Sequence, residues 1–241
     1  MKIVMVLLAE LLISNGFNLT VFPRAQRVPR EHPVSLEIER GPRGRNEFAL
    51  TFDAGGEDAG FAELLEGLGR VRCTFFLTGQ WMQAHPEHVS ALLKAGHELA
   101  NHTWSHRDLT RLTNEEIRSE ILRTGEALDA VAGRSVFRLW RAPFGERDAR
   151  VLRLTRDLGY TSIYWTFDSL DSVAPPKSPE YLVARITHLT SARLDGAILL
   201  MHVGEPSTAR AVPAILADLR RRGLIPVKVS VLLADEKFHS S

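Results

Sequence analysis

The chain has 241 residues, of which 44% are hydrophobic, and this is enough to fill one sizeable core. A formal net charge of +1, with 24% charged residues, excludes a general electrostatic attraction to nucleic acid or to a membrane surface. The single cysteine, Cys73, excludes an internal disulfide, and its apolar neighbours indicate a buried thiol rather than a nucleophile.

The first 45 residues differ in composition from the rest of the chain. Lys2 precedes an apolar run at residues 3–9, which is typical of an export signal, and Glu10 interrupts it. The run is far shorter than the roughly 20 residues that span a bilayer, so we expect no stable membrane span. Residues 24–45 are rich in Arg, Pro and Gly, which indicates an extended basic linker. We therefore expect residues 1–45 to form a signal-like segment with a linker, and the domain at residues 46–241 to act in the cell envelope or outside the cell, with a cytoplasmic location as the alternative.

From residue 46 onward, predicted strands alternate with predicted helices. Seven strands are predicted, at residues 48–52, 71–78, 97–100, 136–140, 160–167, 197–202 and 225–229. Six helices are predicted, at residues 58–68, 80–94, 114–131, 148–158, 179–190 and 208–222. Pro86 is a possible break in the second helix, and Thr113 with Glu116 forms a capping-box pattern before the third. The alternation predicts one α/β domain of βαβ units whose parallel sheet curls toward a barrel.

Five polar motifs follow predicted strands. They are Thr-Phe-Asp-Ala-Gly-Gly at residues 51–56, His-Thr-Trp-Ser-His at 102–106, Arg-Ala-Pro-Phe-Gly at 141–145, Asp-Ser-Leu-Asp at 168–171 and Leu-Met-His at 200–202. The C-terminal ends of parallel strands form the face where α/β folds gather their active sites. Scattered structural residues are not expected to gather at these positions, so the pattern favours one functional site.

Two histidines, His102 and His106, are spaced so that both imidazoles can face one point, and neutral imidazole is a common ligand for zinc. The spacing alone also fits two surface histidines, and the neighbouring motifs favour the metal pair. Five other histidines have no motif around them, and we expect them to have no role in a functional site: His85, His88, His97, His188 and His239.

Taken in order, the five motifs resemble those of the polysaccharide deacetylase family, carbohydrate esterase family four, over about residues 47–232. The family pattern is Thr-Phe-Asp-Asp-Gly, His-Ser/Thr-x-x-His, Arg-x-Pro-Phe/Tyr, Asp-x-x-Asp-Trp and Leu-x-His. The resemblance implies a distorted (β/α)7 barrel in a single domain. It also implies metal-dependent removal of an N-acetyl group, sometimes an O-acetyl group, from a glycan.

The resemblance assigns the proton-transfer roles to four residues. Asp53 resembles the catalytic base, and Arg141 resembles the arginine that orients it. His202 resembles the general acid, and Asp171 the carboxylate that keeps it protonated, because a nearby negative charge raises a histidine's pKa. Asp168 is expected to be structural.

The metal and substrate roles fall on the remaining motif residues. His102 and His106 resemble the ligands of a divalent metal, most simply zinc, with cobalt or nickel as alternatives. Phe144, Gly145 and Leu200 resemble the oxyanion and substrate-binding residues, with the Phe144 backbone N–H as an oxyanion donor. Trp104, Trp165 and the Phe144 ring fit either sugar stacking or core packing.

Two positions depart from the family pattern. Ala54 replaces an aspartate ligand, so only two histidines remain, one fewer than the three protein ligands typical of catalytic zinc. Several alternatives follow for the missing ligand: Asp53 shares the metal, or Glu57 or Asp58 reaches it. Otherwise waters complete the coordination sphere, or the metal is weakly held. Ser172 replaces the tryptophan of the fourth motif, which removes one wall of the usual pocket.

The sequence therefore predicts a metal-dependent deacetylase, a hydrolase of linear amides, acting on an acetylated polysaccharide or oligosaccharide. Peptidoglycan or a chitin-like N-acetylglucosamine polymer is the expected substrate, and nucleic acid is not an expected partner. One alternative is a carbohydrate-binding pseudoenzyme whose metal site was lost or weakened with Ala54. The other is a hydrolase of a non-sugar amide or an O-acetyl ester.

Overall fold

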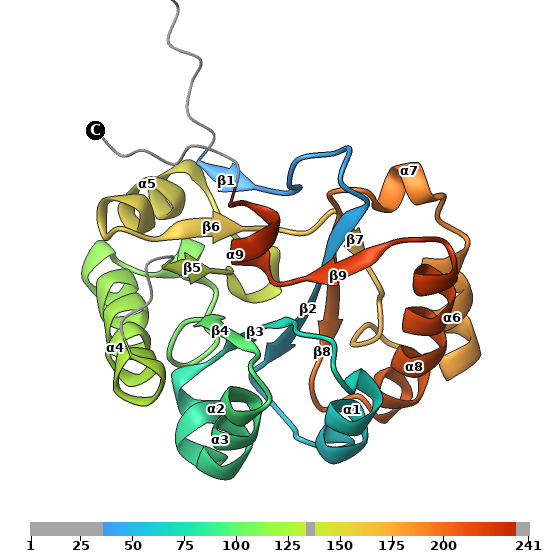
Figure 1. The fold of residues 1–241 in the computed structure, drawn as a ribbon. Helices are drawn as coiled ribbons and strands as arrows, with labels where there is room; N and C mark the ends of the chain where they lie inside the picture. Colours follow the sequence, from blue (N-terminus) through green and yellow to red (C-terminus); the bar gives the residue numbers. More distant parts are fainter. Residues whose placement is uncertain (1–35, 134–137, 235–241) are drawn as a thin grey trace, which may run out of the picture. The chain divides into compact units, whose positions relative to one another are not determined.

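The computed structural model describes residues 36–133 and 138–234, and strand β2 (Glu47–Ala54) lies inside its sheet, where it pairs with three other strands (Figure 1). Strand β8 (Ile198–His202) pairs with residues 49–53 of β2. Strand β3 (Thr74–Leu77) pairs with its C-terminal half, and β9 (Ile225–Val227) with its N-terminal half. All three pairings are parallel. Since β2 is covered on both faces, its sequence reads as a nearly continuous buried run rather than as an alternating one.

The segment from Thr161 to Asp168 closes the sheet into a barrel. Strands β4 (Glu98–Asn101), β5 (Leu139–Trp140) and β6 (Thr161–Ile163) follow β3 in spatial order. Beyond β6 the same segment forms β7 (Phe167–Asp168), which pairs with β8. One stretch of chain therefore contacts β5 at its start and β8 at its end. The single predicted strand at 160–167 divides in two because it changes partners between β6 and β7.

Most helices of the described residues lie outside this sheet, whereas α9 (Val229–Leu232) packs on its inner face, with Ala49 and Ile198 (Figure 1). The other helices are α1 (Phe61–Leu68), α2 (Gly79–Ala84), α3 (Pro86–Lys94), α4 (Asn114–Ala132), α5 (Ala149–Asp157), α6 (Pro179–Thr187), α7 (Ser191–Leu194) and α8 (Pro206–Arg221), with short 3-10 helices at Leu109–Arg111 and Pro143–Gly145. Helices α1, α6 and α8 pack together against β2 and β8 over one apolar cluster, which includes Phe52, Leu199 and Ile215. Helices α4 and α5 enclose a second cluster with Trp140. None of these helices combines the length and hydrophobicity that crossing a bilayer requires.

Several local predictions are confirmed. The second predicted helix breaks at Pro86 into α2 and α3, because proline has no N–H to donate and begins a new helix well. Thr113 and Glu116 form the reciprocal capping box at the start of α4. The α/β class, the single domain and the distorted (β/α)7 barrel are confirmed as well.

Some elements were not predicted. Strand β1 (Glu37–Ile38) lies in the segment predicted as a linker, and it pairs with β6. Its place depends on distant residues: Arg147 donates to the Glu37 carboxylate, and so does Ser162. The predicted signal-like segment, residues 136–137 of the fourth predicted strand and His239 lie outside the described residues.

Candidate active site

A pocket opens at the C-terminal ends of the strands. Two adjoining cavities, of about 280 Å³ and 430 Å³, have five lining residues in common: Asp53, His102, His106, Ser172 and His202. Asp53 and His202 are paired in register on the neighbouring strands β2 and β8. Side chains that are 149 positions apart therefore lie next to each other, which the sequence predicts from the strand ends.

Asp53 is held by a buried arginine. Arg141 Nη1 donates to Asp53 Oδ1 at 2.7 Å and also lies 2.9 Å from the Thr51 hydroxyl, while its Nε donates to the Ile163 carbonyl at 3.2 Å. The Asp53 and Arg141 side chains are 6% and 0% exposed. Burial by itself raises the pKa of Asp53, but the charge and the hydrogen bond of Arg141 bring that pKa below its ordinary value. Asp53 is thus an ionised carboxylate with a fixed direction.

The histidine pair lies in the loop that follows β4. His102 Nδ1 is 3.0 Å from the Arg141 carbonyl oxygen, and a carbonyl only accepts, so this nitrogen carries the proton. His102 Nε2 is thereby left with its lone pair, 3.6 Å from Asp53 Oδ2. The His106 ring lies 4.9 Å from the His102 ring, between centroids. Burial lowers the pKa of both histidines, that of His106 to about 4, so both are neutral at pH 7.

The backbone of this loop is fixed by a glutamate that sequence reasoning missed. The Glu120 carboxylate of α4 accepts from the backbone N–H of Trp104 and of Ser105, and from the Ser105 hydroxyl. His106 has a φ of 58°, a conformation that non-glycine residues rarely adopt without such support. The sequence signal for Glu120 is its position as a charged residue between the apolar positions Ile117 and Ile121 of an amphipathic helix.

The second pair of polar side chains joins β8 to the loop after β7. Asp171 Oδ1 lies 2.7 Å from His202 Nδ1, and Asp171 Oδ2 accepts from the His202 backbone N–H at 2.8 Å. The Thr208 hydroxyl, also missed in the sequence, donates to the same oxygen at 2.6 Å. Burial lowers the pKa of His202, but the Asp171 carboxylate outweighs it, so the pKa of His202 lies above its ordinary value. His202 Nε2 is then the atom that can hold a proton toward the pocket.

The candidate substrate residues line the larger cavity. Phe144, Gly145 and Leu200 all contribute to it, together with Trp165. Phe144 has a φ of 58° and a side chain that is 68% exposed, and its ring meets the His106 ring edge-on at 4.5 Å. An exposed aromatic ring in strained backbone at a pocket edge suits a sugar platform.

Two other residues considered in the sequence, Trp104 and Asp168, make different contacts. Trp104 packs on Gly79, where an added Cβ would meet the indole ring at 2.0 Å, and the Arg123 guanidinium covers it at 3.5 Å. This tryptophan therefore braces α2 and α4. Asp168 lines the cavity, and its Oδ1 accepts from the Leu170 backbone N–H at 2.7 Å.

The two departures from the family pattern have structural counterparts. Ala54 is fully buried and belongs to the same apolar cluster as Phe52, so it adds no polar group to the pocket. Ser172 lies at the junction of both cavities, with its hydroxyl 3.4 Å from His202 Nε2. The pocket also includes Glu57, whereas the Asp58 carboxylate is engaged by His88. Two neutral imidazoles are ligand types that a divalent ion accepts, and the carboxylates of Asp53 and Glu57 line the same pocket.

Comparisons with known proteins agree with this geometry. The family model for polysaccharide deacetylases matches residues 40–178. A chitooligosaccharide deacetylase from Bradyrhizobium sp. (strain ANU 289) is 31% identical over 197 residues, covering 75% of this chain and 87% of that protein. The structure of PdaA from Bacillus subtilis, a family 4 carbohydrate esterase, aligns with a TM-score of 0.74 at 27% identity, over 81% of this chain and 84% of that one.

A third relative is described as an inactive member of the same group. The structure of BA3943 from Bacillus anthracis, a CE4 family pseudoenzyme, aligns with a TM-score of 0.74 at 26% identity, over 81% of this chain and 68% of that one. A mutant of that protein has restored enzymatic activity.

The fold is a barrel with a charged pocket at the C-terminal ends of its parallel strands, and the relatives that it matches make the chain a hydrolase. The chain belongs to the polysaccharide deacetylase family, as the matched residues and the Bradyrhizobium relative show.

Proposed function

We propose that this protein is a metal-dependent deacetylase that removes N-acetyl groups from an N-acetylglucosamine-containing glycan, either peptidoglycan or a chitin-like polymer. The observation that carries the proposal is the meeting of two proton-handling pairs, Asp53 with Arg141 and His202 with Asp171, at one pocket that also holds His102 and His106. A pure sugar-binding protein has no use for a buried base and a charged acid that line one cavity.

The metal proposal rests on His102 and His106. His102 is oriented by the Arg141 carbonyl, which is the kind of backbone partner that fixes a ligating imidazole. Bound there, a divalent ion such as zinc supplies positive charge that favours ionisation of water and polarises a carbonyl. With alanine at position 54, we expect this ion to be held more weakly than in a relative that has the aspartate.

The two pairs divide the proton transfers. Asp53, ionised and aimed by Arg141, accepts the proton of the attacking water. His202, protonated because Asp171 raises its pKa, donates from Nε2 to the departing amine nitrogen. An amine is a poor leaving group unless it is protonated, so the acid is as necessary as the base. The Phe144 backbone N–H is the proposed donor to the carbonyl oxygen as that oxygen gains negative charge.

A panel of acetylated substrates tests the proposal. Purified protein, with and without added zinc, cobalt or nickel, is incubated with chitooligosaccharides, peptidoglycan fragments and O-acetylated glycans, and released acetate is measured. Metal-dependent acetate release from an N-acetylated glycan supports the proposal. Release from none of them, at every metal concentration, contradicts it.

A carbohydrate-binding pseudoenzyme is the second candidate, and Ala54 favours it. The similarity to the pseudoenzyme BA3943 adds to this case. Binding of the same glycans by calorimetry, without acetate release, would distinguish this candidate from the enzyme. A hydrolase of O-acetyl esters would instead release acetate from the O-acetylated glycans alone.

The expected location follows from the substrate. Peptidoglycan and chitin-like polymers lie outside the cytoplasm, so we propose that the N-terminal segment directs export. Cell fractionation of the full chain tests this, and recovery of intact protein only from the cytosol contradicts it.

A further inference from the structure

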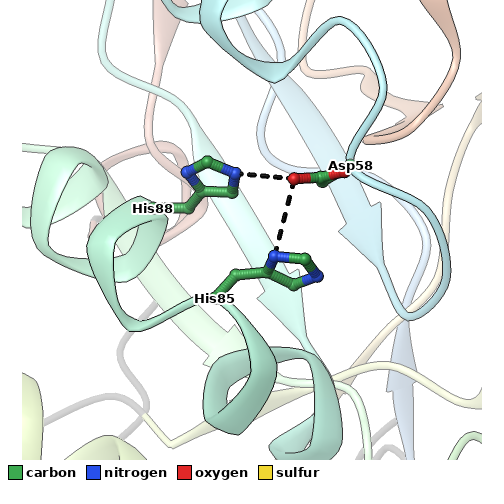
Figure 2. Close-up of side chains that lie close together, drawn as sticks. All are labelled: Asp58, His85 and His88. Atoms are coloured by element: carbon green, nitrogen blue, oxygen red, sulfur yellow. Dashed lines mark hydrogen bonds and ion pairs between the residues drawn. The ribbon is translucent and has the colours of Figure 1, made fainter.

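A second cluster of metal-ligating side chains lies outside the pocket, on the loop between β2 and α1 and at the junction of α2 with α3. Figure 2 shows the carboxylate of Asp58, which belongs to that loop, facing the imidazoles of His85 and His88, which belong to the junction. The Asp58 Oδ2 atom is 2.9 Å from His88 Nε2 and 3.5 Å from His85 Nδ1. The geometry points to a second divalent metal site formed by Asp58, His85 and His88, with zinc as the ion that this ligand set suits best.

The distances between the ligand atoms are those of a metal site. Zinc binds imidazole nitrogen and carboxylate oxygen at roughly 2.0–2.2 Å in tetrahedral geometry, which sets neighbouring ligand atoms about 3.3 Å apart. The two separations from Asp58 Oδ2 lie on either side of that value, and the three ligand atoms are all within 4.8 Å of one another. Small shifts of the side chains bring all three onto one ion. Water completes the sphere, or Glu87, whose Oε1 lies 4.0 Å from His85 Nδ1.

The two imidazoles are held in place before any ion binds. His85 ends α2 and precedes Pro86, so the break between the helices sets its direction. The His88 ring stacks on Phe61 at 4.0 Å between centroids, and the His85 ring lies 5.0 Å from the Trp81 ring. The two imidazole planes are within 4° of parallel. Aromatic neighbours on both sides limit rotamer freedom, so little ordering is required on binding.

Asp58 is suited to be the anionic ligand. Its Oδ2 atom is within reach of both histidines, 2.9 Å from His88 Nε2 and 3.5 Å from His85 Nδ1, and such a side chain binds a metal as the carboxylate. The three side chains are between 22% and 43% exposed, which leaves a path for the ion from solvent.

An ion at this cluster braces the rim of the pocket. Glu57, next to Asp58 in the chain, lines the pocket with Gly55 and Gly56. The same loop packs against the loop after β8, where an added Cβ on Gly204 would lie 2.3 Å from the Glu57 carbonyl oxygen. Fixing Asp58 to α2 and α3 therefore restrains the chain that borders Asp53. The proposal is independent of the activity of the pocket.

Zinc titration of the untagged full chain, after chelator treatment, tests the second site. The titration is carried out in a His102→Ala/His106→Ala background, so that the metal ligands proposed for the pocket do not contribute. We expect one zinc equivalent by calorimetry, its loss on adding His88→Ala, and at least about tenfold weaker binding on adding Asp58→Asn. Asp58→Asn keeps a hydrogen-bond acceptor for the histidines, so it separates metal binding from folding. His188→Ala, at an exposed histidine that follows the end of α6, is the matched control and should change nothing.

Hydrogen exchange gives a second readout that does not depend on activity. Zinc should slow exchange of the amides at residues 55–60 and raise the melting temperature in the double-alanine background, and neither effect should occur with His88→Ala. Absence of zinc binding in that background, or zinc binding that His88→Ala leaves unchanged, overturns the proposal. Failure of the metal site proposed for the pocket has a different signature, since wild type and the double-alanine background would then bind equal amounts of zinc.

Discussion

Arg141 donates a 2.7 Å hydrogen bond to Asp53 from the floor of the pocket, and both side chains are almost entirely shielded from water. A buried ion pair costs desolvation on both sides, so it adds little stability by itself, but removal of one partner leaves an uncompensated charge. Stability and function thus depend on the same contact.

We expect Arg141→Ala to lower the free energy of unfolding by about 3–5 kcal/mol. Adding Asp53→Asn to that variant should restore part of the loss, because the isolated negative charge is then removed. Urea denaturation of the wild type, both single variants and the double variant measures the four free energies of unfolding of this double-mutant cycle. Additive losses, in which the double variant loses the sum of what the two single variants lose, would show that the two charges are not coupled.

Ala54→Asp should tighten metal binding at His102 and His106 by adding an anionic ligand. Ala54 lies in an apolar cluster, so the new, unpaired carboxylate should also lower the free energy of unfolding by about 3–5 kcal/mol when no metal is present. Added zinc should therefore raise the melting temperature of this variant more than that of the wild type. Ala54→Asn, which has nearly the same size without the charge, is the control and should show the smaller shift.

Asp171→Asn should move the alkaline limb of the pH–rate profile to lower pH. His202 donates only when protonated, so turnover falls as pH rises through its pKa, which Asp171 raises above the ordinary value. Loss of the carboxylate removes that increase. Turnover measured from pH 5 to pH 10 checks the shift. An unchanged alkaline limb would show that this limb does not report the titration of His202.

The acid role of His202 also predicts a difference between substrates. An alkoxide leaves more readily than an amine, so His202→Ala should retain relatively more activity on O-acetyl than on N-acetyl substrates. Asp53→Asn should lower turnover by about a hundredfold or more on both, with substrate binding affected much less. Equal losses on both substrates in His202→Ala would count against the assignment.

His97 makes stability sensitive to acid. It is 6% exposed and its Nδ1 accepts from the Cys73 backbone N–H, and burial lowers its pKa to about 4. The unfolded chain binds a proton here near pH 6.5 and the folded chain does not, so stability falls as pH drops from about 6.5 to about 4. Between pH 7 and pH 5, His97→Asn should lose about 1–2 kcal/mol less than the wild type. Urea denaturation at the two pH values measures this difference, and identical losses would mean that His97 is not responsible.

The sequence was sufficient where local patterns decide the outcome. The strands that end at Asp53 and His202 are marked by apolar runs followed by a polar residue, and the α4 capping box is written in four adjacent positions. Predicted helix ends are within a few residues of those observed for the same reason. The prediction that Asp53 and His202 lie close together required only the rule that parallel strands end on one face.

The parts that sequence reasoning missed depend on long-range partners. Strand β1 has two residues, too few for any periodicity, and is positioned by Arg147. Glu120 and Thr208 are single polar residues on amphipathic helices, and their importance appears only when the loops that they contact are in place. No motif surrounds His85 and His88 in the sequence, and their contacts with Asp58, which lies 27 positions upstream of His85, appear only in the fold.

The pairing of β2 has a consequence for how the chain folds. Its partners β8 and β9 begin 151 and 178 residues after the start of β2, so the strand that carries Asp53 is completed only by the last third of the polypeptide. Such high contact order slows folding, because the loop-closure entropy is lost before the distant contacts form. On the ribosome, β2 should remain exposed until β8 has emerged. A fragment ending at residue 178, where the family match ends, should therefore fail to fold, and amides of β2 should exchange among the slowest in the full-length protein.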